Sequence, residues 1–456
     1  MALTFNGGIH IAEHKNTRRC AIETMPAPKI VSIPMSQHIG ANAVPVVKAG
    51  DVVDRGQVIG VIEGGLGCPV HSSVSGTVKE IIEINTADAS AKIRSVVIEN
   101  DGENRLHPDI KPWPKRLGDT TTEEIIEIVR SAGISGMGGA TFPTYAKISS
   151  AIGKVERIIV NCAECEPYLT TNHRLLLEHP DDVINGLKIL MKALGLREGD
   201  IAIEDNKPDA IAKLEECLAD SDLIKVRVLK TKYPQGDERQ IIYALTGKEL
   251  PAGKLPADVG CSVFNAETCA AVCHAFVDGM PLIERIVTVD GDCIKKPGNV
   301  LVPLGTSFVD LINYCGGLVK EPRKIITGGP MMGWARWNVN TAVTKGTSGL
   351  LAFSKDQDVE YDQPPRCIRC GRCVAGCPMR LMPNYLAMFA AQRKFDLCEE
   401  FDVMSCVECG SCSYSCPAHV PIVQRIRAAK GKIKDLRAAQ AAALKQSQVA
   451  PDKDKK

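Results

Sequence analysis

The sequence predicts a multidomain protein in which α/β and β domains precede a small helical domain. Three observations carry this prediction. Short apolar runs separated by Gly and Asp turns occupy residues 28–100, helices alternate with apolar strands over residues 120–280, and two cysteine runs follow residue 366. The chain has 456 residues, of which 45% are hydrophobic, enough for about two to four domains. We expect domains at residues 1–112, 113–282, 283–356 and 357–430, and then a flexible polar tail at 431–456.

Charge and composition exclude several classes of protein. The chain has 55 Lys and Arg against 54 Asp and Glu, so no overall charge attracts nucleic acid. No run of about 18 apolar residues occurs, so we expect no membrane-spanning helix. The first ten residues lack the basic and apolar regions of a signal peptide. Nineteen cysteines without such a signal indicate a reducing, cytoplasmic location, where thiols bind metals rather than form disulfides.

The segment 28–100 is predicted to be all β, because apolar runs such as Val78–Ile84 are bounded by turn residues. Val47–Gly60 and a following Ser-Gly-Thr-Val segment resemble the lipoyl and biotinyl barrel-sandwich family. That family modifies a lysine at its hairpin tip, whereas the tip here, Cys68–Ser73, contains none. We therefore expect a structural or docking module rather than a swinging arm.

Residues 120–280 show the alternation typical of a parallel sheet covered by helices on both faces. A capping box at Thr121–Glu124 predicts the first helix. From residue 283 short strands return, which predicts a small α+β module of the β-grasp type. Strands are expected at Arg157–Val160, Ile201–Glu204 and Lys225–Leu229, and helices at Asp181–Leu194, Pro208–Ala219 and Phe308–Tyr314.

A glycine-rich segment, Gly133–Thr144, joins two predicted helices. Glycines at such a junction let a phosphate approach the backbone, and the next helix offers free N–H groups. The segment matches neither the dinucleotide fingerprint nor the Walker loop, so alone it fits a tight turn equally well. The acidic loop Asn161–Pro167 follows the next strand, at the carboxyl edge where α/β sheets bind ligands.

With Tyr233–Glu238 and Phe264–Thr268, these segments resemble the NADH- and FMN-binding subunit of respiratory complex I. The resemblance implies noncovalent FMN and an NAD(H) site. Ala163 and Asp237 depart from the family's Asp and Glu, and a helix cap or a solvated loop is the simpler alternative for each carboxylate. The resemblance assigns the FMN phosphate to Gly136, Gly138, Gly139 and Lys147, the isoalloxazine and ribityl to Asn161, Glu164, Asn265 and Thr268, and the nicotinamide nucleotide to Phe142, Glu166 and Glu238.

Cys162 and Cys165 form a C-x-x-C pair within the acidic loop. A redox dithiol and half of a zinc site are two interpretations of such a pair. Because no second pair follows nearby, we adopt the third interpretation, two separate loop thiols.

The runs Cys367–Pro378 and Cys406–Pro417 both read C-x2-C-x2-C-x3-C-P. This is the spacing of bacterial two-cluster ferredoxins, in which the fourth cysteine of each run binds the other cluster. Structural zinc, which takes four ligands, usually as two pairs, or a disulfide framework would leave the repeated extra cysteine and proline unexplained. We therefore predict two [4Fe-4S] clusters. Cluster one is expected on Cys367, Cys370, Cys373 and Cys416, and cluster two on Cys377, Cys406, Cys409 and Cys412.

The order of these modules and the opening Phe5–Lys15 resemble the C-subunit family of Rnf electron transport complexes, over all of the chain except its tail. The resemblance implies a peripheral subunit on the cytoplasmic side of a membrane-bound, ion-translocating ferredoxin:NAD oxidoreductase. Its implied partners are the other subunits and ferredoxin or a ferredoxin-like subunit. NAD(H), FMN and the clusters would carry the chemistry, with no catalytic side chain. The alternatives are a soluble cobalamin-reductase-type enzyme of a microcompartment and a non-catalytic electron-relay subunit.

Overall fold

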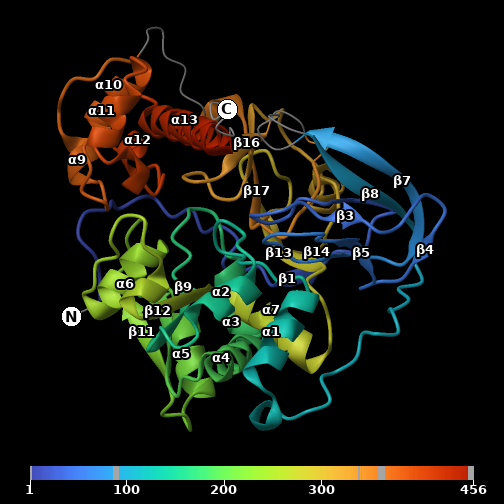
Figure 1. Cartoon of the computed structure of the whole chain (residues 1–456). Coiled ribbons are helices and arrows are strands. Elements are labelled where there is room, and N and C mark those ends of the chain that lie inside the picture. The colour runs from blue at the N-terminus through green and yellow to red at the C-terminus, as the bar shows by residue number, and fades with distance from the viewer. Residues whose placement is uncertain (1–2, 86–91, 337–338, 340, 358–364, 450–456) are drawn as a thin grey trace, which may run out of the picture.

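The computed structural model describes residues 3–85, 92–336, 339, 341–357 and 365–449. Figure 1 shows the C-terminal helices above the central α/β region and the N-terminal β module to one side of it. The predicted domain boundary between residues 356 and 357 lies next to residues 358–364, which are outside the described residues, as are residues 450–456 at the end of the predicted tail.

The N-terminal β module consists of two facing antiparallel sheets. Its core is formed by alternate residues, so Val31 and Ile33 are fully buried while Ile30 is exposed. The strand expected at Val78–Ile84 is present and is longer at both ends, Gly76–Asn85. One sheet has the order β2 (Ile30–Pro34), β8 (Lys92–Asn100), β7 (Gly76–Asn85), β4 (Val52–Val53), and the other β3 (Val44–Pro45), β5 (Val58–Val61), β6 (Val70–His71).

Residues 3–20, which we call the strap, lie outside these two sheets. Leu3 and Ile9 form single bridges with Leu229 and Tyr233 of the α/β domain. Immediately after the strap, β1 (Ile22–Thr24) joins the sheet of the third module, the α+β module predicted at residues 283–356. The first residues of the chain therefore connect the later domains to one another.

The α/β domain is built on a four-stranded parallel sheet in the order β11-β10-β9-β12. Thr121 and Glu124 form the predicted capping box at the first helix. The strands are β9 (Arg157–Cys162), β10 (Gly199–Glu204), β11 (Ile224–Leu229) and β12 (Cys261–Asn265), and the helices are α1 (Thr122–Ser131), α2 (Thr144–Ala151), α3 (Thr171–Glu178), α4 (Pro180–Leu194), α5 (Pro208–Cys217), α6 (Glu238–Thr246) and α7 (Ala266–Val277).

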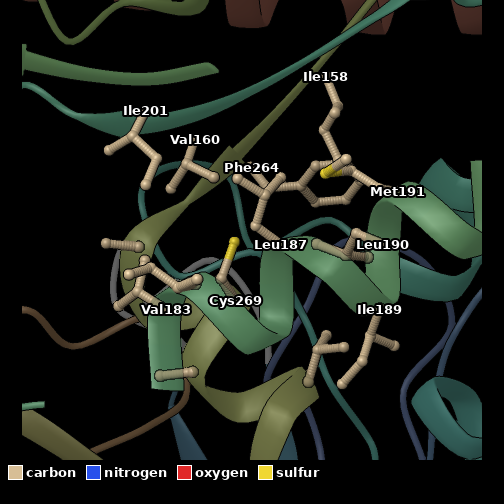
Figure 2. Packing of buried hydrophobic residues seen from close by; sticks show 14 of the residues in the cluster. Ile158, Val160, Val183, Leu187, Ile189, Leu190, Met191, Ile201, Phe264 and Cys269 are labelled. Atoms are coloured by element: carbon tan, nitrogen blue, oxygen red, sulfur yellow. The ribbon is translucent and has the colours of Figure 1, made fainter. Parts of the chain in front are cut away.

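Both faces of this sheet are buried. Figure 2 shows Val160 and Phe264 from the sheet packing with Leu187 from α4. Ile159, the neighbour of Val160 in β9, points to the other face and packs with Ile241 of α6. The two-sided parallel sheet that the alternation predicts is therefore confirmed, with α4 within one residue of its expected start.

The third module has a six-stranded mixed sheet and one helix over it, α8 (Phe308–Tyr314), as expected. Phe308 and Leu311 of this helix are fully buried against the sheet. The strand order is β1, β14 (Gly298–Pro303), β13 (Glu284–Asp290), β17 (Gly349–Phe353), β15 (Lys324–Thr327), β16 (Trp334–Arg336).

The C-terminal domain is helical and ends in one long helix, α13 (Ile422–Val449). This helix continues without interruption past residue 431; Ile433 is still buried, but every side chain from Lys434 to Ala442 is exposed, so that part of the helix is solvated. None of the helices within the described ranges is long and apolar enough to cross a membrane. The shorter helices are α9 (Arg372–Ala375), α10 (Pro383–Ala391), α11 (Phe395–Glu400) and α12 (Ser411–Tyr414).

Candidate functional site

The glycine-rich segment forms a closed turn between α1 and α2. The Gly136 N–H donates to the carbonyl of Phe142 (2.8 Å), and the Met137 N–H donates to the hydroxyl of Thr268 (3.0 Å). A Cβ on Gly138 would lie 2.8 Å from the side chain of Asn265, so this position must lack a side chain. The structure thus brings the glycine turn against Asn265 and Thr268, as the resemblance implies, and leaves Gly138, Gly139 and Phe142 exposed.

Lys147 supplies a cation beside this turn. Its Nζ lies 3.4 Å from Oε2 of Glu238, at the start of α6, and 5.4 Å from the ring centre of Phe264. The ammonium is partly exposed, so it is available to an incoming phosphate as a point charge. Lys147 and Glu238, both assigned to the nucleotide site, are therefore neighbours.

Two amides lie at the carboxyl edge of the sheet. Asn161 and Asn265 are paired in the register of β9 and β12. Asn161 Nδ2 donates to the carbonyl of Gly236 (2.8 Å), and Asn265 Nδ2 donates to Oδ1 of Asn172 (2.7 Å). Both side chains are thereby held in one orientation, which suits a planar ligand that needs fixed donors and acceptors.

Glu164 occupies a different place from the one implied. Its carboxylate accepts hydrogen bonds from the backbone N–H groups of Asn172 (2.8 Å) and His173 (3.2 Å) in the first turn of α3. A carboxylate there also interacts favourably with the helix dipole. The carboxylate of Glu164 thus takes the simpler of the two alternatives, a helix cap.

The carboxylate of Glu166 likewise binds backbone N–H groups, and these belong to the third module. Its two carboxylate oxygens accept from the N–H groups of Met331 (3.0 Å) and Met332 (2.8 Å), which lie in the turn between β15 and β16. Burial raises the pKa of Glu166 to about 7, although these N–H groups and Lys15 act in the opposite direction. Glu166 therefore links the acidic loop to the third module.

This raised pKa predicts a pH effect. The folded pKa of Glu166, about 7, lies above its ordinary value of 4.5, so its contribution to stability is full below that ordinary value and is lost as the pH rises through about 7. The urea midpoint of Glu166→Gln should therefore depend less on pH than that of the wild type between pH about 5 and about 8. The exposed Glu249→Gln should behave like the wild type, and equal slopes for all three proteins would contradict the assignment.

Lys15 is a site residue that sequence reasoning missed. Its buried ammonium donates to the carbonyls of Glu164 (2.8 Å), Glu166 (2.8 Å) and Leu169 (2.6 Å). Desolvation lowers the pKa of Lys15, while the nearby Glu164 carboxylate raises it. The strap therefore fixes the backbone of the acidic loop. The opening Phe5–Lys15 is the only signal in the sequence for this role.

Cys162 and Cys165 do not act as a pair in the structure. Cys162 is buried, and Cys165 Sγ accepts a hydrogen bond from the Gly236 N–H (3.3 Å). Burial raises the pKa of both thiols, so neither is activated as a nucleophile. Cys162 is the last residue of β9, whereas Cys165 lies in the loop and helps to hold the segment Tyr233–Glu238 against the acidic loop.

Four cysteines of the predicted cluster two line one hollow. Cys377 comes from the first run and Cys406, Cys409 and Cys412 from the second, as the ferredoxin spacing predicts. Burial, together with the neighbouring thiols, raises the pKa of Cys409 to about 11, so a positive metal centre is needed to hold these groups as thiolates. The donor set thus fits an iron–sulfur cubane. The other walls are mainly apolar, formed by Pro378, Leu381, Pro383, Leu386, Val407, Val423 and Ile426.

A single-ion site is not the geometry found. Among the residues that the structure describes, no three His, Cys, Asp or Glu side chains converge as one metal ion would require. Structural zinc draws its ligands to about 2.3 Å from one point, whereas a cubane binds each thiolate at a separate iron. The four thiols around one hollow are the number and kind of ligands that a cubane needs.

The two cysteine runs share one backbone conformation. Arg369 and Glu408, at equivalent positions, both have a φ of 58°, and each N–H donates to the sulfur two residues earlier (3.4 Å). Gly371 and Gly410, also equivalent, have φ values of 77° and 81°. Such N–H···S bonds tune the reduction potentials of clusters. The repeat in the sequence is thus a repeat in structure.

The predicted cluster one lies at the surface. Cys367 and Cys370 are exposed, while Cys373 is buried beside Cys367. A Cβ on Gly376 would lie 3.4 Å from the hydroxyl of Ser415, which brings the end of the first run beside Cys416. Cluster one would therefore lie at the outer face of the domain and cluster two in its interior.

Profiles of four known families match consecutive parts of the chain. They are the RnfC barrel sandwich hybrid domain (residues 3–103), the Nuo51 FMN-binding domain (129–274), the SLBB domain (286–335) and the 4Fe-4S dicluster domain (366–420). The predicted combination of fold classes is thereby confirmed.

Similar proteins match nearly the whole chain. The C subunit of the Na⁺-translocating ferredoxin:NAD⁺ oxidoreductase complex of Acetobacterium woodii is 44% identical over 94% of this chain and 97% of its own. The C subunit of the proton-translocating ferredoxin:NAD⁺ oxidoreductase complex of Clostridium ljungdahlii is 43% identical over 95% and 94%. The C subunit of the ion-translocating oxidoreductase complex of Rhodobacter capsulatus is 41% identical over 95% and 84%.

Proposed function

The chain belongs to the family of C subunits of Rnf complexes, the ion-translocating ferredoxin:NAD oxidoreductases, and we propose that it transfers electrons between NAD(H) and the ferredoxin side of such a complex. FMN and two [4Fe-4S] clusters are its cofactors. It works as one subunit of an oxidoreductase complex, peripheral and on the cytoplasmic side of the membrane. The soluble microcompartment enzyme is not favoured, since the similar proteins are named as subunits of complexes.

One observation carries the proposal. The segment Tyr233–Glu238 touches both halves of the site, because the Gly236 carbonyl accepts from Asn161 and the Tyr233 hydroxyl donates to the carbonyl of Cys409 (2.6 Å). The candidate flavin edge and the hollow for cluster two are therefore joined through one short loop. Such an arrangement supports electron transfer within this chain rather than through a separate carrier.

Different residues of the site are proposed to bind different parts of the two nucleotides. We propose that Gly136, Gly138, Gly139 and Lys147 hold the FMN phosphate, and that Asn161, Asn265 and Thr268 orient its ring and ribityl chain. Phe142 and Glu238 contact the nicotinamide nucleotide. Glu164 and Glu166 bind backbone N–H groups with their carboxylates and so fix the conformation of the acidic loop beside the flavin. When bound, FMN exchanges hydride with NAD(H) and single electrons with a cluster.

The outer face of the cluster domain is proposed to meet the electron partner. Cys367 and Cys370 of cluster one are exposed there, together with Arg366, Arg369 and Arg372. Their positive charge complements an acidic ferredoxin or ferredoxin-like subunit. Electrons would thus pass between NAD(H), FMN, cluster two, cluster one and that partner, in either direction.

The test of the function is anaerobic addition of NADH to the full chain reconstituted with iron, sulfide and FMN. Bleaching of the flavin absorbance, followed by that of the broad iron–sulfur band, is expected. Intact clusters and flavin that do not respond to NADH would favour the non-catalytic relay subunit instead.

Gly138→Ala should weaken FMN binding at least about tenfold, which corresponds to about 1.4 kcal/mol. The new Cβ would meet the Asn265 side chain at 2.8 Å, closer than packed atoms allow, so either the glycine turn or the Asn265 side chain must move, and both belong to the proposed flavin site. Titration with FMN, followed by quenching of flavin fluorescence, measures the change. Gly118→Ala, whose Cβ would meet no atom within 4 Å, is the matched control. Unchanged affinity in Gly138→Ala would remove the glycine turn from the flavin site.

A further inference from the structure

The strap lies between the α/β domain and the cluster domain, where Figure 1 shows the N-terminal trace passing close to α6. Ile9 and Tyr233 exchange two backbone hydrogen bonds (2.8 and 2.9 Å). A Cβ on Gly7 would lie 2.6 Å from the carbonyl oxygen of Cys377, and one on Gly8 would lie 2.7 Å from that of Tyr233. Both glycines have positive φ values, 74° and 73°. The strap can follow this path only because both residues lack side chains.

Tyr233 joins this strap to the cluster domain. Its backbone holds Ile9, while its side chain, which is 1% exposed, donates to the Cys409 carbonyl. Cys377, which meets Gly7, and Cys409 come from different runs, yet both line the hollow of cluster two. The strap and Tyr233 therefore contact that cluster's ligands from both runs.

A second set of contacts holds the same hollow from another side. The Lys430 ammonium donates to the carbonyl of Cys406 (2.6 Å), and Arg427 donates to the carbonyl of Met332 (3.2 Å). Both residues belong to α13, so the cluster domain stays attached to the third module without Tyr233. A change at Tyr233 should therefore shift cluster two rather than unfold the domain.

We infer that Gly7, Gly8, Ile9 and Tyr233 form a clamp that fixes cluster two against the flavin-facing loop, and that they are positioning residues for electron transfer between flavin and cluster two. The inference rests on the proposed function. The step moves one electron from flavin reduced by NADH to the oxidised cluster, and no bond to the protein forms or breaks. The clamp would set the separation of the two cofactors and the polarity around the Cys409 end of the cluster.

Tyr233→Phe tests the clamp by deleting one hydroxyl. Stopped-flow absorbance should show flavin reduction by NADH at the wild-type rate and bleaching of the clusters slowed about threefold to tenfold. The electron paramagnetic resonance spectrum of the protein reduced with dithionite, which bypasses the flavin, should change in the signal of cluster two. The matched control is Tyr243→Phe, because the Tyr243 hydroxyl accepts from Asn6 in the strap (3.1 Å) and contacts no cluster ligand through a described hydrogen bond.

Gly7→Ala tests the other arm of the clamp, and Gly253→Ala is its control. Gly253 has nearly the same φ, 73°, but a Cβ there would meet no atom within 4 Å. Gly7→Ala should slow cluster bleaching or lose the iron of one cluster, while Gly253→Ala should do neither.

Wild-type bleaching rates and spectra in both Tyr233→Phe and Gly7→Ala would overturn the clamp. A wild-type protein that NADH fails to reduce would instead overturn the proposed function. In that case the dithionite-reduced spectra and the iron content still decide whether the clamp exists, because neither measurement needs NADH.

Discussion

Replacing Cys377 by alanine is expected to abolish cluster two, although Cys377 belongs to the first cysteine run. Cys377 lines the same hollow as Cys406, Cys409 and Cys412, so three ligands would remain around an open corner. Iron and acid-labile sulfide should fall to about half of the wild-type content, because one of the two clusters is lost. Cluster one should remain, since Cys377 binds the other cluster in the crossed arrangement. NADH should then reduce the flavin but not cluster one, since the inner cluster of the proposed path is missing.

The control for this experiment is Cys398→Ala in the same domain. Cys398 is fully buried and makes only a weak contact with the Leu386 carbonyl (3.9 Å), so both clusters should be retained. Cys367→Ala should remove cluster one and leave the spectrum of cluster two. If Cys377→Ala and Cys367→Ala lose the same cluster, the crossed ligation is wrong and each run binds its own.

Replacing Arg285 by methionine is expected to destabilise the α/β domain by about 3–5 kcal/mol. Arg285 is completely buried, with its Nε 3.3 Å from Oε2 of Glu267, and it donates to the carbonyl of Lys345 (2.6 Å). Without the guanidinium, the carboxylate of Glu267 is left buried without its cation. The same carboxylate accepts from Thr171 (2.8 Å) beneath the candidate flavin site, so FMN binding should weaken too.

Anaerobic urea unfolding, followed by circular dichroism, measures this loss. The double variant Arg285→Met with Glu267→Gln should recover part of the stability, because no buried charge then lacks a partner. Lys248→Met, which breaks the exposed pair with Glu156, should change stability by at most about 1 kcal/mol. A loss in Arg285→Met no larger than in Lys248→Met would show that the buried pair is unimportant.

Those parts of the fold that depend on local periodicity and spacing could be predicted from the sequence. Ile158 and Val160 face one side of β9 and Ile159 the other, which the continuous apolar run indicates. The crossed cysteine set of cluster two likewise follows from residue spacing alone, because tight loops leave few ways to arrange the thiols. These elements depend on residues that are close together in the chain, so local sequence patterns are enough to predict them.

The roles of the acidic residues could not be predicted in this way. Glu166 binds N–H groups 165 and 166 residues away, and no local pattern marks such a partner. Glu164 caps a helix that begins at Thr171, too far along the chain to match a capping motif. Lys15 reaches the acidic loop from the strap. In each case tertiary packing decides where the side chain points after its strand or turn has ended.

The contact of Gly7 with the Cys377 carbonyl spans most of the chain, and this constrains the order in which the molecule can fold. The strap precedes both cysteine runs in the chain, so it cannot take its final path until both runs have been synthesised. Contacts between residues so far apart in the sequence are expected to form late in folding, because the entropy of loop closure is lost before the contact can stabilise the chain. We therefore expect the cysteines of the inner cluster to stay accessible to iron–sulfur delivery until the strap docks against Cys377.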